Sequence, residues 1–129
     1  MSFSDYWELE ILDHILNDGA YTAPTIYIGL STADPGDDAA ALAEPVGNGY
    51  ARVATAAADW NAAASGAKTN ANAITFAAAS GSWGTITYVC LFDALTSGNL
   101  LASGSCGSEA VTTGNIVRFA AGALSVSLG

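Results

Sequence analysis

The sequence predicts a mainly β protein, an antiparallel β-sandwich or jelly-roll-like domain of about seven or eight strands with one N-terminal α-helix. An apolar pattern of helical period occupies only residues 1–19. From residue 25 onward, short runs of alternating apolar side chains recur between turns rich in Gly, Asn, Asp and Ser. A length of 129 residues suits one compact domain, residues 1–129, with the helix in 1–19 and the sandwich in 25–129.

The N-terminal helix is predicted by a four-residue spacing of large apolar side chains. This apolar stripe consists of Phe3, Trp7, Ile11, Ile15, Leu12 and Leu16. Ser2 is the expected N-cap, with Asp5 three positions later favouring the positive end of the helix dipole. Gly19 is the expected C-terminal stop.

Short strands are expected through the rest of the chain. Their ranges are 26–30, 50–56, 73–78, 85–92, 99–105, 109–112, 116–119 and 124–128. In the run 85–92, Ile86, Tyr88, Cys90 and Phe92 alternate with a second set that is also partly apolar. A strand that is apolar on both faces is typical of the centre of a sheet, so we expect this one to be central.

A long connection covers residues 33–49 and is typical of a binding loop or a mobile loop. Its segment Asp34-Pro-Gly-Asp37-Asp38 places three carboxylates within five residues, which could bind calcium through hard oxygen ligands. The segment lacks the ligand spacing of an EF-hand, and Asp-Pro-Gly-Asp is also a strong turn sequence. We therefore favour a turn and expect no metal site.

Composition restricts the partners that the protein can bind. Twelve acidic and three basic residues give a net charge of −9, too few cations for a duplex-binding surface or an anionic membrane. No signal peptide and no apolar run of about eighteen residues is apparent, so we expect synthesis in a cytosol. Cys90 and Cys106 lie in strand-like runs and are expected to be free, buried thiols.

The sequence offers no recognisable catalytic motif. His14 is the single histidine, so neither a metal site nor a Ser-His-Asp or Cys-His arrangement is indicated. No glycine-rich phosphate loop follows a strand. We therefore expect a protein that is not an enzyme and that has no cofactor.

Protein binding is the remaining class of function. Tyr50 and Trp83 lie in Gly-rich turns, where an aromatic side chain either anchors an interface or folds back to cap the sandwich. The candidate partner-binding residues are Trp7, Ile11, Asp34, Asp37, Asp38, Tyr50 and Trp83. Much of the apolar content is alanine, which buries little area per residue, and burial against neighbouring chains would strengthen such a core.

Several segments, taken in order, resemble a family of small phage virion proteins. They are Glu10–His14, Ala20–Pro24, Ile26–Pro35, Gly47-Asn-Gly-Tyr-Ala-Arg52, Trp83–Thr87, Phe92-Asp-Ala94, Gly98–Leu101 and Gly122-Ala-Leu124. Members are commonly labelled phage tail fibre proteins, and similar proteins are capsid decoration (cement) proteins whose β-rich subunits sit as trimers on the head. The resemblance implies no catalytic residues.

From this resemblance we expect a bacteriophage virion structural protein. The chain has no repeat that could build a fibre shaft, which favours a capsid decoration protein that stabilises the head. Such a protein would lie on the capsid surface as a homotrimer and bind the major capsid protein through the helix or through loop 33–49. The alternative is a tail fibre or tail-tip component that recognises the host.

Overall fold

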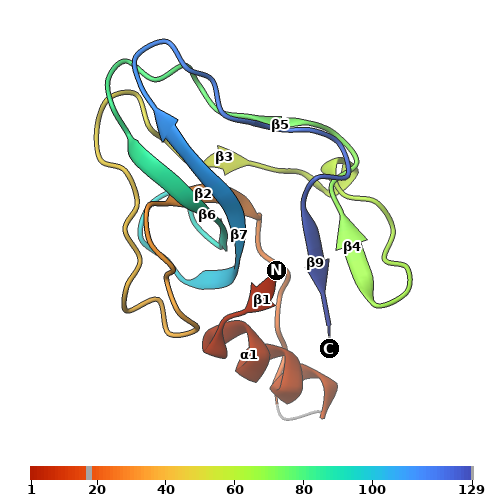
Figure 1. Cartoon of the computed structure of the whole chain (residues 1–129). Coiled ribbons are helices and arrows are strands. Elements are labelled where there is room, and N and C mark those ends of the chain that lie inside the picture. Colours follow the sequence, from red (N-terminus) through yellow and green to blue (C-terminus); the bar gives the residue numbers. More distant parts are fainter. Residues whose placement is uncertain (17–18, 129) are drawn as a thin grey trace.

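The computed structural model describes residues 1–16 and 19–128, which form one α-helix, one short 3-10 helix and nine strands (Figure 1). The helices are α1 (Asp5–Ile15) and η1 (Ala57–Asp59). The strands are β1 (Ser2–Phe3), β2 (Tyr27–Ser31), β3 (Val53–Ala54), β4 (Ala67–Thr69), β5 (Ile74–Thr75), β6 (Gly84–Phe92), β7 (Leu100–Val111), β8 (Arg118–Phe119) and β9 (Ser125–Ser127). The predicted class, mainly β with one N-terminal α-helix, is confirmed.

The strands form a sandwich-like arrangement in which every pairing is antiparallel. The main sheet has the order β1-β7-β6-β2-β3, and two small ribbons, β4–β9 and β5–β8, face it. Side chains from both layers meet in one core, where Ile28 and Leu91 of the sheet lie in the same cluster as Ile74 and Val126 of the ribbons. Strands β1 and β4 were not predicted, because two or three residues without apolar alternation leave no periodic signal.

Strand β6 is central, as predicted, and pairs with both β2 and β7. A β-bulge between Ile86 and Tyr88 interrupts the expected alternation along it. Ile86 faces the main core together with Val89 and Leu91, whereas Tyr88 faces the opposite side of the sheet. The prediction that Ile86 and Tyr88 share a face was wrong, because a bulge inverts the two-residue period.

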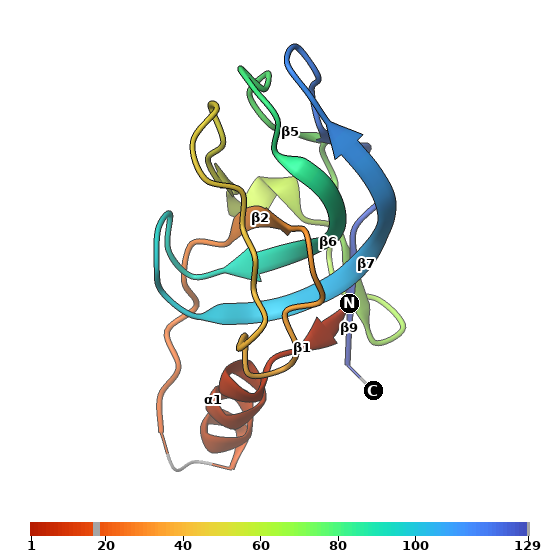
Figure 2. The same ribbon diagram turned by 60° about the vertical axis from the view of Figure 1, so that its left-hand side comes forward.

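The structure also corrects the assignment of the next strand. The sequence predicted two strands, 99–105 and 109–112, whereas β7 runs continuously from Leu100 to Val111 and bends along β6 (Figure 2). Gly107 adopts a φ of 94° between the two halves, a conformation in which glycine carries no steric penalty. The apparent break in the sequence is therefore a bend within one strand.

Helix α1 begins at a different cap from the one predicted. Ser4, not Ser2, is the N-cap, and its hydroxyl accepts a hydrogen bond from the Trp7 amide at 3.3 Å. Ser2 instead pairs with Ser103 in the short strand β1. The helix ends at Ile15, and residues 17–18, ahead of the expected stop at Gly19, lie outside the described part of the chain.

Loop 33–49 forms a cover over the second face of the main sheet. Leu42 and Ala39 pack against a small apolar cluster of Cys90, Phe92 and Leu100. Asp34 Oδ1 accepts from the Gly36 amide at 3.0 Å, and Asp38 Oδ1 accepts from the Ala40 amide at 2.9 Å, as expected for the turn. The loop therefore contributes to the packing of the fold.

The two cysteines are both free thiols, but only Cys90 is buried. Cys106 is exposed, so the prediction of two buried thiols was wrong for this residue. Cys106 lies in the outer half of β7, beyond the two residues, Ala102 and Ser103, that pair with β1.

In the described part of the chain, no helix is both long and apolar enough to cross a membrane.

Candidate partner-binding site

The start of helix α1 is fixed to the rest of the domain by hydrogen bonds. The Ser4 amide donates to the Leu101 carbonyl at 2.8 Å, and the buried Ser4 hydroxyl donates to the Leu100 carbonyl. The Asp5 amide donates to the Asp37 carbonyl of loop 33–49 at 3.0 Å. The two segments that the sequence suggested for partner contact therefore meet where the lower tip of loop 33–49 reaches the start of α1 (Figures 1 and 2).

The inner side of α1 packs on the domain through its first turns. Phe3, Tyr6 and Trp7 are partly buried against the main core, and the Phe3 and Trp7 rings lie 4.5 Å apart between centroids. No residue of the helix is fully buried. Trp7 and Ile11, two predicted partner-binding residues, are therefore half-buried at the junction of helix and domain.

Beyond these contacts, the helix carries large apolar side chains that are more than half exposed. We call this the outer face of α1, and its residues are Leu9, Leu12, Ile15 and Leu16. These are four of the eight exposed large apolar side chains in the described part of the chain. The predicted stripe included the last three as packing residues, but only the first turns of α1 reach the sheet. An exposed patch of this kind is typical of a protein interface.

An apolar groove lies beside the inner side of the helix. It has a volume of about 400 Å³, and its lining includes Trp7, Tyr21, Ile26, Trp60 and Val126. Trp7 Nε1 and Tyr21 Oη are shielded from solvent, and neither has a hydrogen bond of good geometry among the described residues. Burial raises the pKa of the Tyr21 phenol, while the Trp7 indole acts to lower it.

The acidic residues of the loop lie near the helix start. Asp34, Asp37 and Asp38 are exposed, and Asp34 Oδ2 also accepts from the Tyr88 hydroxyl at 3.1 Å. No three His, Cys, Asp or Glu side chains in residues 1–16 and 19–128 are grouped as a metal site. The backbone contact of Asp37 with Asp5 brings this acidic segment to the start of α1.

Tyr50 and Trp83 pack into the main core. Trp83 is only 4% exposed, its indole N–H donates to the Asn48 carbonyl at 2.8 Å, and its ring meets the Tyr50 ring edge-on at 5.3 Å. The structure thus shows the arrangement in which the two aromatics fold back to cap the sandwich. A partner could not contact the Trp83 ring without opening the fold.

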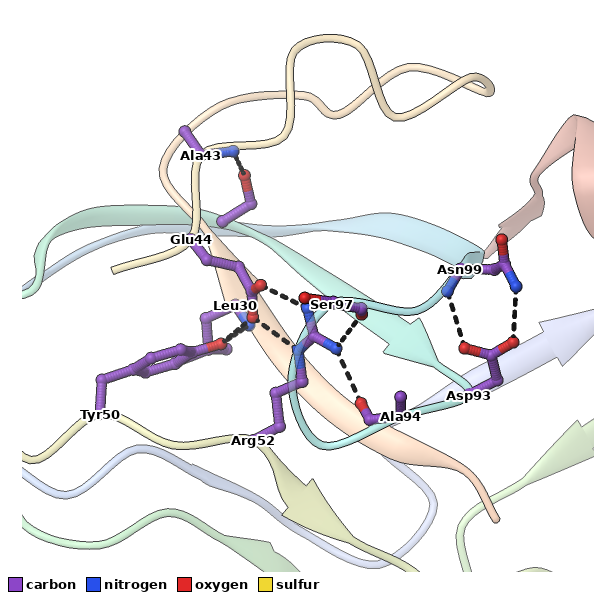
Figure 3. A network of polar contacts seen from close by, with 10 residues as sticks. Leu30, Ala43, Glu44, Tyr50, Arg52, Asp93, Ala94, Ser97 and Asn99 are labelled. Atoms are coloured by element: carbon purple, nitrogen blue, oxygen red, sulfur yellow. Dashed lines mark hydrogen bonds and ion pairs between the residues drawn. The ribbon is translucent and has the colours of Figure 1, made fainter. Parts of the chain in front are cut away.

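A buried ionic network at the end of the sheet had not been predicted (Figure 3). Arg52 is 8% exposed; its Nε donates to Glu44 Oε1 at 2.9 Å, and its Nη2 donates to Glu44 Oε2. Arg52 Nη1 donates to the carbonyls of Ala94 at 2.7 Å and Ser97 at 2.8 Å. The network joins loop 33–49 to the turn at residues 93–98. The only indication of this network in the sequence was Arg52, one of three basic residues, which ends the segment Gly47–Arg52 that resembles the phage family.

Phe92 and Tyr50 complete the network. The Arg52 guanidinium lies 3.5 Å from the centroid of the Phe92 ring, a cation–π contact. The Tyr50 hydroxyl donates to Glu44 Oε1 at 2.8 Å and accepts from the Leu30 amide at 2.9 Å. Burial holds the pKa of the Tyr50 phenol well above its ordinary value, so the group stays a neutral donor.

These features define a small structural domain with a β core, an acidic loop packed on the sheet and an exposed apolar helix face, a combination typical of proteins that bind other proteins. The model of one family, described as podophage GP4 fiber I protein gp80, matches residues 2–127, and the chain belongs to this family. It is therefore a phage virion structural protein of a fibre family rather than a member of an enzyme family. No curated protein matches the chain.

Proposed function

We propose that this protein is a globular component of a phage tail fibre and attaches to neighbouring virion proteins through α1. The observation that carries the proposal is the match of residues 2–127 to a family of fibre proteins. The outer face of α1 supports the attachment, because exposed apolar side chains gather there. Loop 33–49 lies beside the helix start and can widen the contact.

The compact fold favours a module at the base or tip of a fibre over a shaft. A shaft is an elongated, repeating assembly, whereas residues 1–16 and 19–128 form one sandwich-like unit with a single main core. Fibres are commonly trimeric, and a homotrimer is the oligomer that we propose. Size-exclusion chromatography with light scattering measures that state directly.

Capsid decoration is the second candidate function. One specific observation favours it: the helix and loop 33–49 meet at Asp5 and Asp37, so a single surface could bind the major capsid protein across a joint in the shell. Stable protein interfaces bury about 1,200–2,000 Å² in total, and many copies would multiply a modest contact into strong shell stabilisation. Host recognition by a tail tip remains a further variant of the fibre proposal.

Location and copy number in intact virions separate the two functions. Immunogold labelling with antibodies to this chain, together with quantitative mass spectrometry, should find a few copies confined to the tail. A label over the whole head, with copy numbers comparable to those of the capsid protein, would establish decoration and overturn the fibre proposal. A virion that lacks the chain altogether would overturn both.

The fold also decides which variants test the attachment. Removing loop 33–49 would uncover Phe92 and Leu100, so a loss of binding in that variant would report unfolding. Leu9→Ser and Leu16→Ser alter exposed side chains and should leave the domain folded. Failure of the Leu9→Ser/Leu16→Ser double variant to enter virions would support attachment through α1, whereas normal incorporation would contradict it.

A further inference from the structure

The outer face of α1 has the spacing of a coiled-coil seam. Leu9, Leu12 and Leu16 follow each other at intervals of three and four residues, as at the a, d and a positions of a heptad. Each of the three side chains is at least 53% exposed. A seam with this spacing packs best against another helix, whose side chains enter the holes between the leucines.

The charges beside the seam argue against a second copy of the same helix. Glu8 and Asp13 occupy flanking g and e positions, and both are exposed. In a parallel pair, Glu8 of one copy would face Asp13 of the other. A parallel pair therefore brings carboxylates together, and the net charge of −9 makes identical copies repel each other in either orientation, which disfavours self-association through this face.

The surroundings of the helix contain few positive charges. Of the three basic residues, Arg52 is buried in the network with Glu44, Arg118 lies on β8, and Lys68 of β4 lines the groove on the inner side of the helix rather than the seam. The acidic loop residue Asp37 meets the helix at Asp5. A partner helix would thus approach an apolar seam flanked by the carboxylates of Glu8 and Asp13.

A groove next to the seam offers space for a large side chain of the partner. It has a volume of about 640 Å³, and Ile11, Leu12 and Leu128 are among its lining residues. Leu12 thus belongs to both the seam and the groove, and Leu128 is 63% exposed. An occupant with bulky apolar side chains on one helical face fits both features.

From the seam and its flanking charges we propose that the outer face of α1 docks an amphipathic helix of a different protein, one that carries Lys or Arg beside its own apolar seam. This inference rests on the proposed function, in which α1 attaches the chain to other virion proteins. The leucines supply apolar burial. Glu8 and Asp13 favour a basic partner and disfavour a parallel pairing of identical copies.

Two designed helical peptides of about three heptads serve as probes. Both carry Leu at every a and d position, and they differ only in Lys or Glu at every e and g position. Fluorescence anisotropy with the full chain should show the Lys peptide binding about tenfold or more tighter than the Glu peptide. Glu8→Lys with Asp13→Lys should reverse that preference.

A charge-neutral variant separates helix docking from simple attraction of a cation to an acidic protein. Leu12→Ser with Leu16→Ser keeps the net charge and should weaken Lys-peptide binding about tenfold. Leu95→Ser, at an equally exposed leucine in the distant turn 93–98, is the matched control and should bind normally. Circular dichroism checks the fold, and Leu9→Ser replaces the double variant should that variant unfold.

Three results would overturn the inference: no peptide binding, binding that survives loss of the seam, and stronger binding of the Glu peptide. Sedimentation of the wild-type chain adds a fourth, because self-association abolished by Leu12→Ser/Leu16→Ser would assign the seam to a second copy. Peptide binding by a chain that is absent from virions would overturn the proposed function while supporting this inference.

Discussion

The carboxylate of Glu44 and the guanidinium of Arg52 face each other in a two-point ion pair, with Nε and Nη2 of the arginine donating to the two carboxylate oxygens (Figure 3). The same arginine donates to two carbonyls in the turn 93–98. A bidentate pair fixes direction as well as distance. It thereby holds two loops in one arrangement at the end of the main sheet.

Arg52→Met should destabilise the domain by about 3 kcal/mol, because Glu44 and two carbonyls would lose their partner in a mostly buried setting. Urea unfolding followed by tryptophan fluorescence measures this loss. Adding Glu44→Gln should cost less in the Arg52→Met background than in the wild type. Strictly additive effects of the two changes would contradict a coupled pair.

Gly29→Ala should destabilise the domain by about 1–3 kcal/mol through overpacking. A Cβ at this position would lie 2.7 Å from Phe92 Cε2 and 3.0 Å from Glu44 Oε1, so both sides of the network would have to move. Thermal unfolding tests this expectation. Gly19→Ala, where the nearest atom is 3.8 Å away, is the control and should change the midpoint little.

The tyrosines at positions 50 and 21 should respond in opposite ways to loss of the hydroxyl. Tyr50→Phe removes the partner of the Leu30 amide and of Glu44, and should cost about 1–3 kcal/mol. Tyr21→Phe removes a shielded hydroxyl without a good partner, so stability should stay equal or rise slightly. Denaturant midpoints of the two variants provide the comparison, and a large loss in Tyr21→Phe would reveal a partner for that hydroxyl.

Thiol labelling should distinguish the two cysteines. Burial raises the pKa of the Cys90 thiol to about 12, so its reactive thiolate is scarce at neutral pH. The pKa of Cys106 is also raised by desolvation, but its side chain is exposed. Iodoacetamide at about pH 8 should therefore modify Cys106 in the native protein and Cys90 only after unfolding. Equal labelling rates would contradict the buried position of Cys90.

The raised pKa of Cys90 also predicts a loss of stability in alkali. The thiol keeps its proton in the folded state above the ordinary thiol value of 9.0, whereas the unfolded chain releases it. The folded state therefore loses stability as pH rises from about 9 toward 12. Cys90→Ala should unfold with a weaker dependence on pH over this range, and an unchanged dependence would contradict the assignment to Cys90.

The sequence by itself determined the features that arise from local periodicity. The four-residue spacing around Trp7 and Ile11 is enough to specify a helix, and two apolar faces are enough to place the strand ending at Phe92 in the centre of a sheet. Family membership is likewise readable from segments such as Gly47–Arg52. These features require no knowledge of contacts between distant parts of the chain.

Only the tertiary structure decided which of these residues are available to a partner. Arg52 donates to the carbonyls of Ala94 and Ser97, which follow it by 42 and 45 positions in the sequence. Trp83 donates to a carbonyl that precedes it by 35 positions. The burial of these two side chains could therefore not be predicted from a local pattern. The bulge at Ile86 and Tyr88 likewise depends on the pairing of β6 with β7. The outer face of α1 stays exposed for the same reason: a helical period shows that a face is apolar, but the contacts made elsewhere in the fold determine whether that face is covered.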